Sequence, residues 1–506
     1  MEIKFRPYQK EVINATIKAF EKGYKNVIVE APTGFGKSLV NYIVAKYFWQ
    51  KLNKRTWYTT PQVVLLDQLE NDPLIKQLGG IAIIKGRDKY ICPISKTVDY
   101  KELPCNLAPC VTRKYFNCPD KAQCPYYQAR DKALSSPISA LSFAFMLTTK
   151  DIEDWGQRDL LIVDEADDLE NWAVEYGTLT FRVSRTFDNI FQIIQWAKTR
   201  LSNVRTEINF IENMEKLTPQ LVARLESLRK LEQKLEFFLS DAQEHPDNWA
   251  WCQNGSLLEL KPIDAGIVLN KTIWWRGKYR LISSATIINA ELFKKYTGLK
   301  GKTLFIRVPH PIPPENRPVY IHPIGKMTKE ERQNTYDPLV KAIEEIAERH
   351  KGQNGIIQCH SYEIAQEIAK RLKLKGFKVI THNTKDRDEK FKEFLNSTEP
   401  SVFIAVGFER GIDLKYDLCR WQVITKVPFP DQSDIRVHEL WVKRRNWKWA
   451  RYIAIKSLVQ ACGRSVRAPD DYAVTYILDS SIEHLLKYKK EFPKWFLDSI
   501  SYLYEF

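Results

Sequence analysis

The sequence lacks any run of about 18 uncharged apolar residues, the length that a helix needs to cross a bilayer, so we expect no membrane span. Its first five residues, MEIKF, contain no apolar signal core, and we therefore expect a protein that is not exported. Nine cysteines, an odd number, include no Cys-x₂-Cys pair and argue against a secreted disulfide framework in a chain of 506 residues.

Acidic residues are outnumbered, because 77 Lys and Arg residues stand against 62 Asp and Glu residues and leave a net charge of +15. The excess is spread along the chain and favours a polyanionic partner, nucleic acid above all, with a merely basic soluble protein as the alternative. A hydrophobic content of 44% fits a folded protein. The length predicts roughly three or four domains.

Residues 31–38, APTGFGKS, form the strongest motif. The residues before them predict a buried strand and those after them a helix, which is the context that a phosphate-binding loop requires. Glycines let backbone N–H groups surround a phosphate, and the helix N-terminus adds a favourable dipole. Lys37 would reach the β- and γ-phosphates, and the Ser38 hydroxyl would ligate Mg²⁺. The predicted nucleotide ligands in this loop are Thr33, Gly34, Gly36, Lys37 and Ser38.

Another apolar strand, predicted over residues 160–163, ends in Asp164 and Glu165. At the C-terminal end of such a strand, Asp164 would bind Mg²⁺ through water. Glu165 would orient and deprotonate the water that attacks the γ-phosphate. With Lys37 upstream, the two acids predict ATP hydrolysis as well as ATP binding.

Two weaker signals lie near the phosphate loop in the sequence. Gln9 could hydrogen-bond an adenine edge, although a polar residue at a helix start is also ordinary. Residues 56–61 predict a strand whose final hydroxyls, including that of Thr60, suit a nucleic-acid phosphate.

Five cysteines fall between positions 92 and 124, in a segment rich in Pro, Lys and Asn. Because this segment has few periodic apolar residues for a core, we expect a metal centre to organise it. Zinc usually binds close cysteine pairs, which are absent, whereas an iron–sulfur cluster accepts four thiolates at wider spacing. Unligated exposed thiols are the remaining alternative. The five are Cys92, Cys105, Cys110, Cys118 and Cys124, so one is in excess.

Residues 170–262 predict a helical insertion. Thr218 as N-cap and Pro219 in the first turn begin one helix, whose leucine stripe is either internal core or a partner surface. The Pro-rich residues 308–314 predict a stiff linker between domains. Strands and helices then alternate and predict a second α/β domain, with strands at residues 319–322, 355–359, 378–381, 402–406, 422–427 and 473–478.

Two motifs of this second domain follow predicted strands. Residues 407–413 end in Asp413, which we expect at the nucleotide cleft. Gln460 opens a helical motif in which Arg464 and Arg467, three residues apart, share one face and could point at a phosphate held by the first domain. A solvated basic face is the alternative.

Residues 441–449, WVKRRNWKW, interleave aromatic and cationic side chains. Such a pattern suits single-stranded nucleic acid, which binds through base stacking and phosphate contacts. Equally, the tryptophans could pack a helix against its own domain.

The order of these features resembles superfamily 2 helicases. The shared motifs are Gln9, the phosphate loop, DEAD at residues 164–167, SAT at 284–286 and QxxGRxxR at 460–467. The cysteine segment between the loop and the acids narrows the resemblance to the iron–sulfur XPD/DinG-like helicases. Residues 89–92, 124–127 and 311–318 are similar to that family too, and the resemblance covers nearly the whole chain.

The resemblance implies an α/β protein with two RecA-like P-loop motor domains, the first interrupted by a [4Fe–4S] domain and a helical Arch domain. The implied ranges are 1–84, 136–169 and 263–308 for motor domain 1, 85–135 for the cluster domain, 170–262 for the Arch and 315–506 for motor domain 2. Such proteins hydrolyse ATP with Mg²⁺ and move 5′→3′ on single-stranded DNA. We accordingly expect a monomeric DNA helicase acting on forked DNA, in the cytoplasm, because the cluster needs a reducing compartment for assembly.

Residue roles carried over from the family follow the motifs. Thr286 would couple hydrolysis to motion, and Gln460, Arg464 and Arg467 would close the ATP cleft. The implied cluster ligands are Cys92, Cys110, Cys118 and Cys124, with Cys105 as an alternate, and the implied DNA contacts include Arg87, Lys89 and Tyr90.

Two departures from the family pattern stand out. Asp167 occupies a position where the family usually has His. Arg410 follows Glu409 where the family has Glu directly before Gly.

Two other functions remain open from the sequence. One is a translocase that remodels R-loops or protein complexes and unwinds duplex weakly. The other is a redox-sensing nucleic-acid binder with a vestigial ATPase.

Overall fold

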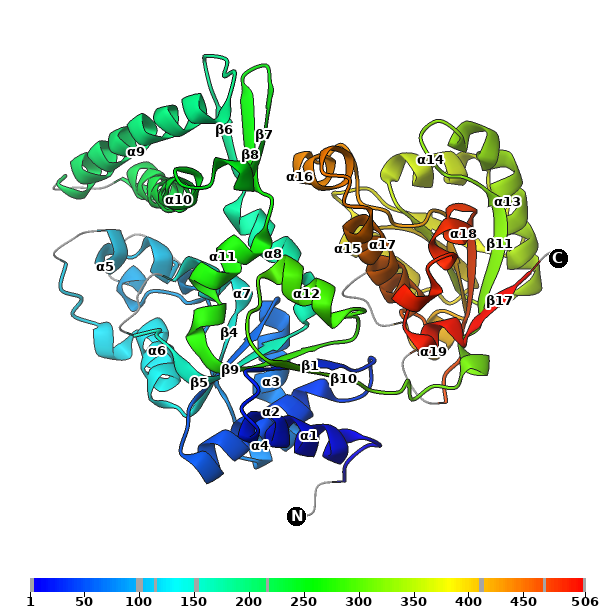
Figure 1. Cartoon of the computed structure of the whole chain (residues 1–506), viewed down its shortest axis with the longest axis horizontal. Coiled ribbons are helices and arrows are strands. Elements are labelled where there is room, and N and C mark those ends of the chain that lie inside the picture. The colour runs from blue at the N-terminus through cyan, green and yellow to red at the C-terminus, as the bar shows by residue number, and fades with distance from the viewer. Residues whose placement is uncertain are drawn as a thin grey trace.

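The computed structural model describes residues 4–96, 103–112, 116–149, 154–214, 218–408, 414–466 and 470–503. Asp413 and Arg467 lie outside the described residues. Two α/β domains lie side by side, and a helical insertion projects from the first (Figure 1). None of the helices in these ranges combines the length and the apolar character that a bilayer crossing requires.

The first domain is built on a seven-stranded sheet in which all paired strands run parallel. In spatial order the strands are β10 (Thr303–Arg307), β1 (Asn26–Glu30), β9 (Gly277–Ser284), β5 (Arg158–Asp164), β2 (Thr56–Thr60), β4 (Ile138–Ser142) and β3 (Ala82–Ile83). β1 is buried along its whole length, as its apolar sequence predicts. Because the strands are parallel, the phosphate loop after β1 and the acids after β5 lie at one edge of the sheet.

Helices connect and cover these strands (Figure 1). They are α1 (Gln9–Glu21), α2 (Lys37–Leu52), α3 (Val63–Asn71), α4 (Pro73–Gln77), α6 (Pro125–Ser135), α7 (Phe143–Thr148), α8 (Leu169–Gly177), α11 (Ala265–Thr272) and α12 (Ala290–Thr297). Leu169 and Ala173 of α8 are fully buried in the core of this domain. The predicted start of the insertion at residue 170 therefore falls within a helix that belongs to the core of the first domain.

The helical insertion, from β6 (Leu179–Arg182) to β8 (Leu257–Pro262), contains the helices α9 (Ile190–Glu212) and α10 (Pro219–Ala242). Leu225, Leu228 and Leu235 of α10 are buried against α9, which confirms the core interpretation of the leucine stripe. The insertion is not wholly helical, because β6, β8 and β7 (Trp249–Asn254) form an antiparallel sheet that the sequence reading missed.

The cysteine segment lies against the insertion. It holds only one short α-helix before α6, namely α5 (Pro109–Thr112), among the residues that the structure describes. Asn106 donates a hydrogen bond to Glu226 of α10 at 3.2 Å, and Arg229 of α10 donates to the Val111 carbonyl at 2.5 Å. The two insertions thus contact each other as well as the first domain.

The second domain has its own seven-stranded parallel sheet. Its strands in spatial order are β13 (Lys378–Thr381), β14 (Ser401–Val406), β12 (Gly355–Cys359), β15 (Trp421–Ile424), β16 (Val474–Asp479), β11 (Val319–Gly325) and β17 (Ile500–Tyr502). All six predicted strands are confirmed. Its helices are α13 (Arg332–Arg349), α14 (Tyr362–Arg371), α15 (Arg387–Leu395), α16 (Ile435–Val437), α17 (Trp447–Cys462), α18 (Ser481–Leu486) and α19 (Lys494–Leu497).

The two domains share a hydrophobic core where α17 meets the first domain. Ile288 and Leu292 of the first domain belong to the same buried cluster as Trp449 and Tyr452 of α17. The Tyr452 hydroxyl donates to the Ile287 carbonyl at 3.2 Å. Helix α17 therefore contacts the first domain directly.

Candidate functional site

The phosphate loop has the backbone that its glycines predict. Gly34 and Gly36 adopt φ values of 80° and 83°, a region that L-residues disfavour, and α2 begins directly afterwards at Lys37. A Cβ atom on Gly36 would lie 2.6 Å from Nε2 of Gln9, so the side chain of Gln9 also requires glycine there. The loop thus presents backbone N–H groups at a helix N-terminus, the geometry that binds phosphate.

The side chain of Gln9 is hydrogen-bonded to the backbone of this loop. Its side chain is 1% exposed, and its Nε2 donates to the Phe35 carbonyl at 2.6 Å while its Oε1 accepts from the Arg6 backbone N–H. In this structure Gln9 fixes the loop, and its contact with an adenine stays a prediction.

The two acids after β5 face the loop. Lys37 Nζ lies 3.3 Å from a carboxylate oxygen of Glu165, which itself has a φ of 50°. Positive φ at a non-glycine residue is a strained conformation of the kind that clusters at functional sites. Burial raises the pKa of the Glu165 carboxyl, and the charge of Lys37 opposes that rise. A raised pKa suits a general base.

Asp164 is held by two neighbouring strands. The Tyr58 hydroxyl of β2 donates to it at 2.5 Å, and the Ser283 hydroxyl of β9 donates at 2.7 Å. Burial, and next the charge of Asp164, raise the pKa of Tyr58 far above its usual range, so the tyrosine remains a donor. Neither partner was predicted from the sequence. Ser283, near the end of β9, was a usable signal, whereas Tyr58 lies in the middle of β2.

The second domain completes the site through α17. Its Gln460 amide donates to the Asp167 carboxylate, and its Lys456 donates to the Asp167 carbonyl at 2.8 Å. Ser284, the first residue of the SAT motif, donates to the same carboxylate at 2.5 Å. Asp167, at the position where the family usually has His, therefore joins the acidic motif, the SAT motif and the second domain. Lys456 was missed, although a lysine in an apolar helical stripe was a signal.

A cavity of about 540 Å³ lies between the two domains, within the usual size range of ligand sites. Thr33, Glu165 and Thr286 line it from the first domain. Gln460 and Arg464 line it from the second, as the sequence predicts. The cavity is therefore bordered by the phosphate loop, the acids and the predicted arginine motif.

The five cysteines of the segment from Cys92 to Cys124 are all at least half-buried. Cys92, Cys105 and Cys124 are buried, and Cys110 and Cys118 are half-buried. Burial, together with the nearby Cys124 thiol, raises the pKa of Cys105 to about 12. Cys105, the predicted alternate ligand, is thus as enclosed as the two predicted outer ligands.

The thiol spacing allows a test of metal fit. The Sγ atoms of Cys105 and Cys124 lie 3.9 Å apart, close to the roughly 3.8 Å between two thiolates on one tetrahedral zinc with bonds of about 2.3 Å. No group of three or more metal-binding side chains is assembled among the residues that the structure describes. The residue types suit a thiolate-bound metal, either a zinc ion or an iron–sulfur cluster.

The residues predicted to contact DNA differ in their exposure to solvent. Thr60 is 1% exposed, and its hydroxyl is buried without a hydrogen-bond partner in the described part of the chain. The Arg87 guanidinium packs over the Tyr126 ring at 4.2 Å, and the Tyr90 hydroxyl accepts from the Lys85 backbone N–H. Lys89 is half exposed. Only Lys89 of these four is presented openly to solvent.

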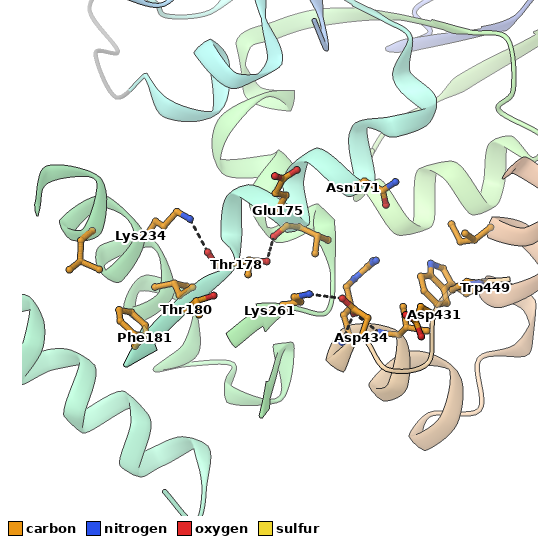
Figure 2. A pocket seen from close by; sticks show the side chains of 17 residues that line it. Asn171, Glu175, Thr178, Thr180, Phe181, Lys234, Lys261, Asp431, Asp434 and Trp449 are labelled. Carbon is orange, nitrogen blue, oxygen red and sulfur yellow. Dashed lines mark hydrogen bonds and ion pairs between the residues drawn. The ribbon is translucent and has the colours of Figure 1, made fainter. Parts of the chain in front are cut away.

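A second cavity, of about 710 Å³, lies between the base of the helical insertion and the second domain. Figure 2 shows Lys261 of β8 directed at Asp434 from the opposite wall, where they form an ion pair at 2.5 Å. Lys234 of α10 donates to the Thr178 carbonyl at 2.9 Å (Figure 2). Lys261 and Lys234 are already bonded to protein groups, and acidic side chains line the same walls. This interdomain cavity is therefore a poor site for a polyanion.

Comparison with protein families gives two matches. A model described as a helicase C-terminal domain matches residues 343–499. A model described as the res subunit of type III restriction enzymes matches residues 2–172. The first match falls in the second α/β domain, and the other covers the phosphate loop and the acidic motif.

Among characterised relatives, the chain is similar to the ATP-dependent DNA helicase DinG of Photobacterium profundum, with 24% identity over 51% of this chain and 38% of DinG. It is 22% identical to the probable ATP-dependent helicase MJ0942 of Methanocaldococcus jannaschii over 94% of this chain and 91% of that protein. The ATP-dependent DNA helicase YoaA of Haemophilus influenzae is 21% identical over the same shares.

Solved structures share the fold. One titled XPD helicase matches with a TM-score of 0.63 and 18% identity, covering 99% of this chain and 100% of the other. Xpd4 of S. tokodaii matches with a TM-score of 0.59 and 15% identity, covering 98% and 100%. Both motor sheets therefore have the RecA-like arrangement that the sequence predicts. Together the family models, the relatives and the shared fold show that the chain is similar to XPD/DinG-like helicases of superfamily 2.

Proposed function

We propose that this chain is an ATP-dependent DNA helicase whose two motor domains move relative to each other as ATP is hydrolysed between them. The observation that carries the proposal is the cleft in which Glu165 of one domain, paired with Lys37, faces Gln460 and Arg464 of the other. A protein that only binds nucleotide needs the phosphate loop and the acids of the first domain, but not the facing residues of the second. The substrate class comes from the relatives named as DNA helicases.

The residues of the cleft have distinct tasks in hydrolysis. Lys37, now paired with Glu165, would exchange that carboxylate for the phosphates of ATP and so release Glu165 to orient and deprotonate water. Ser38 and Asp164 would hold Mg²⁺, which neutralises charge on the phosphates. Arg464 would approach the phosphates from the second domain.

Asp167 would transmit the state of the cleft to the second domain. It binds Ser284 of the first domain and Gln460 of α17, so a shift of the acidic motif is passed to both. The Thr286 hydroxyl, two residues after Ser284, is buried without a hydrogen-bond partner in the described ranges. A buried orphan hydroxyl costs free energy, so closure of the domains that supplies a partner would be favoured.

The cysteine segment would hold a [4Fe–4S] cluster and separate the strands as the motor moves 5′→3′. Cys92 and Cys124 would be the outer ligands. Cys110 and Cys118 would be the inner pair, because the spacing from Cys118 to Cys124 resembles that of the DinG family. The burial of Cys105 beside Cys124 makes it a competitor for one inner position. A cleft formed within one chain supports a monomeric motor, and cluster assembly supports a reducing compartment such as the cytoplasm.

Steady-state ATP hydrolysis with and without single-stranded DNA tests the proposal. Wild type should be stimulated by the DNA, and Glu165→Gln should lose about 10²-fold or more of the rate while still binding ATP, because the base is absent. Lys37→Ala should lose ATP binding as well. Lys51→Ala, an exposed lysine on the same helix, is the matched control and should behave as wild type. An ATPase that ignores DNA, or that survives Lys37→Ala, would contradict the proposal.

A further inference from the structure

Residues 441–449 divide into two kinds of aromatic side chain. Trp441 and Trp449 are buried, with 8% and 2% of their surface exposed, and they pack as ordinary core residues. Trp447 is 54% exposed and is the one exposed tryptophan in the described part of the chain. Packing of the helix against its own domain thus explains Trp441 and Trp449. It does not explain why the Trp447 ring is exposed.

The turn that carries Trp447 is firmly held. Arg445 has a φ of 51°, and the Trp447 backbone N–H donates to the Arg445 carbonyl at 2.9 Å. Asn446 caps α17 and exchanges hydrogen bonds with the Tyr296 hydroxyl of the first motor domain at 3.0 and 3.1 Å. The Trp447 ring packs edge-on against Trp441, with centroids 5.6 Å apart. A rigid exposed ring loses little conformational entropy when a ligand covers it.

The charge around Trp447 is positive. Residues 438–448 contain four Lys and Arg residues and one acid, Glu439. Glu439 pairs with Lys443 and Arg444. Arg445 and Lys448, which flank Trp447, are exposed and have no acid within ion-pair distance among the residues that the structure describes. An aromatic ring between two available cations is the arrangement that stacks a base and binds its phosphates.

Trp447 also occupies the end of α17 opposite to the ATP cleft. The helix runs 16 residues from Trp447 to Cys462, or about 24 Å at 1.5 Å per residue. Its far end carries Gln460 and leads directly to Arg464. The adjoining residue Arg444 donates to the Asp247 carbonyl at the base of the helical insertion. A ligand on Trp447 would therefore contact the helix that also borders bound nucleotide.

We propose that Trp447, with Arg445 and Lys448, is a contact site for single-stranded nucleic acid, in which the indole stacks on a base and the two cations bind adjacent phosphates. The site rests on the proposed helicase function and adds a DNA contact on the second motor domain. Because the site lies on α17, the bound nucleic acid would contact the same helix that closes the ATP cleft.

Binding of a fluorescein-labelled oligothymidylate to the full chain, followed by anisotropy over a range of salt concentrations, tests this site. Trp447→Ala should weaken binding about ten-fold, and Trp447→Phe should recover most of the loss because a phenyl ring still stacks. The double variant Arg445→Ala/Lys448→Ala should make the slope of log K against log salt less negative by about 1.4, since each single-strand phosphate contact contributes about 0.7. Phe210→Ala, which removes a 66% exposed aromatic ring from α9, is the control and should bind as wild type.

Two outcomes would overturn the inference. One is Trp447→Ala binding that stays within about two-fold of wild type, when stacking predicts about ten-fold. The other is equal weakening of Trp447→Ala and Trp447→Phe together with a lowered unfolding midpoint, which would mark a structural role. If the ATPase of wild type is stimulated by DNA while Trp447→Ala binds the oligothymidylate as tightly as wild type, the proposed contact site is wrong and the proposed helicase function is unaffected.

Discussion

The ion pair between Arg436 and Glu170 joins the second motor domain to the helix that follows the acidic motif. Arg436 Nη2 lies 2.5 Å from a Glu170 oxygen, and the two side chains are 6% and 4% exposed. Arg436 Nε donates to the Ile263 carbonyl at 2.9 Å, and the Trp449 indole donates to the same Glu170 oxygen at 3.1 Å. The pair is thus almost wholly buried, and each side chain has one further hydrogen-bond partner.

Removing one partner should be costly. Arg436→Met leaves the Glu170 carboxylate buried with the Trp449 indole as its one remaining donor among the described residues, and loss of one member of a buried pair costs about 3–5 kcal/mol. No discount for solvent screening applies, because both side chains are almost wholly buried. The double variant Arg436→Met/Glu170→Leu buries no lone charge, so its loss should be smaller than that of either single variant.

Urea denaturation followed by circular dichroism, together with DNA-stimulated ATPase, measures this effect in the full chain. Midpoints are the quantity to compare, since a multidomain chain need not unfold in one step. The control is Arg224→Met, which breaks an exposed pair with Glu207 and should cost about 1 kcal/mol or less. Losses that simply add in the double variant would refute the coupling between Arg436 and Glu170.

Three further predictions concern the cleft and the cysteine segment. Asp167→Ala should lower DNA-stimulated ATP hydrolysis about ten-fold, as expected for a lost charged hydrogen-bond network of 1–3 kcal/mol, and leave ATP binding unchanged in equilibrium binding assays; an unaltered rate would contradict the role of Asp167. Burial lowers the pKa of His310 to about 3, so the unfolded chain takes up the proton first and stability is lost as pH falls from about 6.5 towards 3. His310→Asn, which keeps an acceptor for the Ile312 N–H, should flatten that loss in melts at pH 7 and 5, and identical pH profiles would count against it. Purified protein should show visible absorbance that Cys124→Ser abolishes and Cys252→Ser retains, whereas zinc without such a band would exclude the iron–sulfur cluster.

Much of the fold follows from local patterns in the sequence. The strands β1 and β12 are short apolar runs bounded by polar or turn residues, and burial on both faces of a parallel sheet gives that pattern directly. The α10 leucines repeat at helical spacing, so their buried stripe was foreseeable. The antiparallel sheet of the insertion was missed because β6 has only four residues, with two buried and two exposed, beside two long helices.

The cleft was predictable by motif but its contacts were not. Glu165, Gln460 and Arg464 were all expected there, and all three line one cavity, while Lys37 pairs with Glu165. The burial of Gln9 could not be foreseen, because it depends on a loop that returns 26 residues later.

Partners across the domain boundary were equally hidden from the sequence. Arg436 and Glu170 are separated by 266 residues, and Lys456 and Asp167 by 289. Such pairings depend on how two separate sheets dock, which no local pattern encodes.

Strand displacement on a duplex with a 5′ single-stranded tail tests the central claim most directly. The account predicts that wild type separates the strands only when ATP and Mg²⁺ are present, and that Lys37→Ala, which removes the phosphate-binding ammonium, separates none. Equal displacement by wild type and Lys37→Ala, or displacement without ATP, would contradict it.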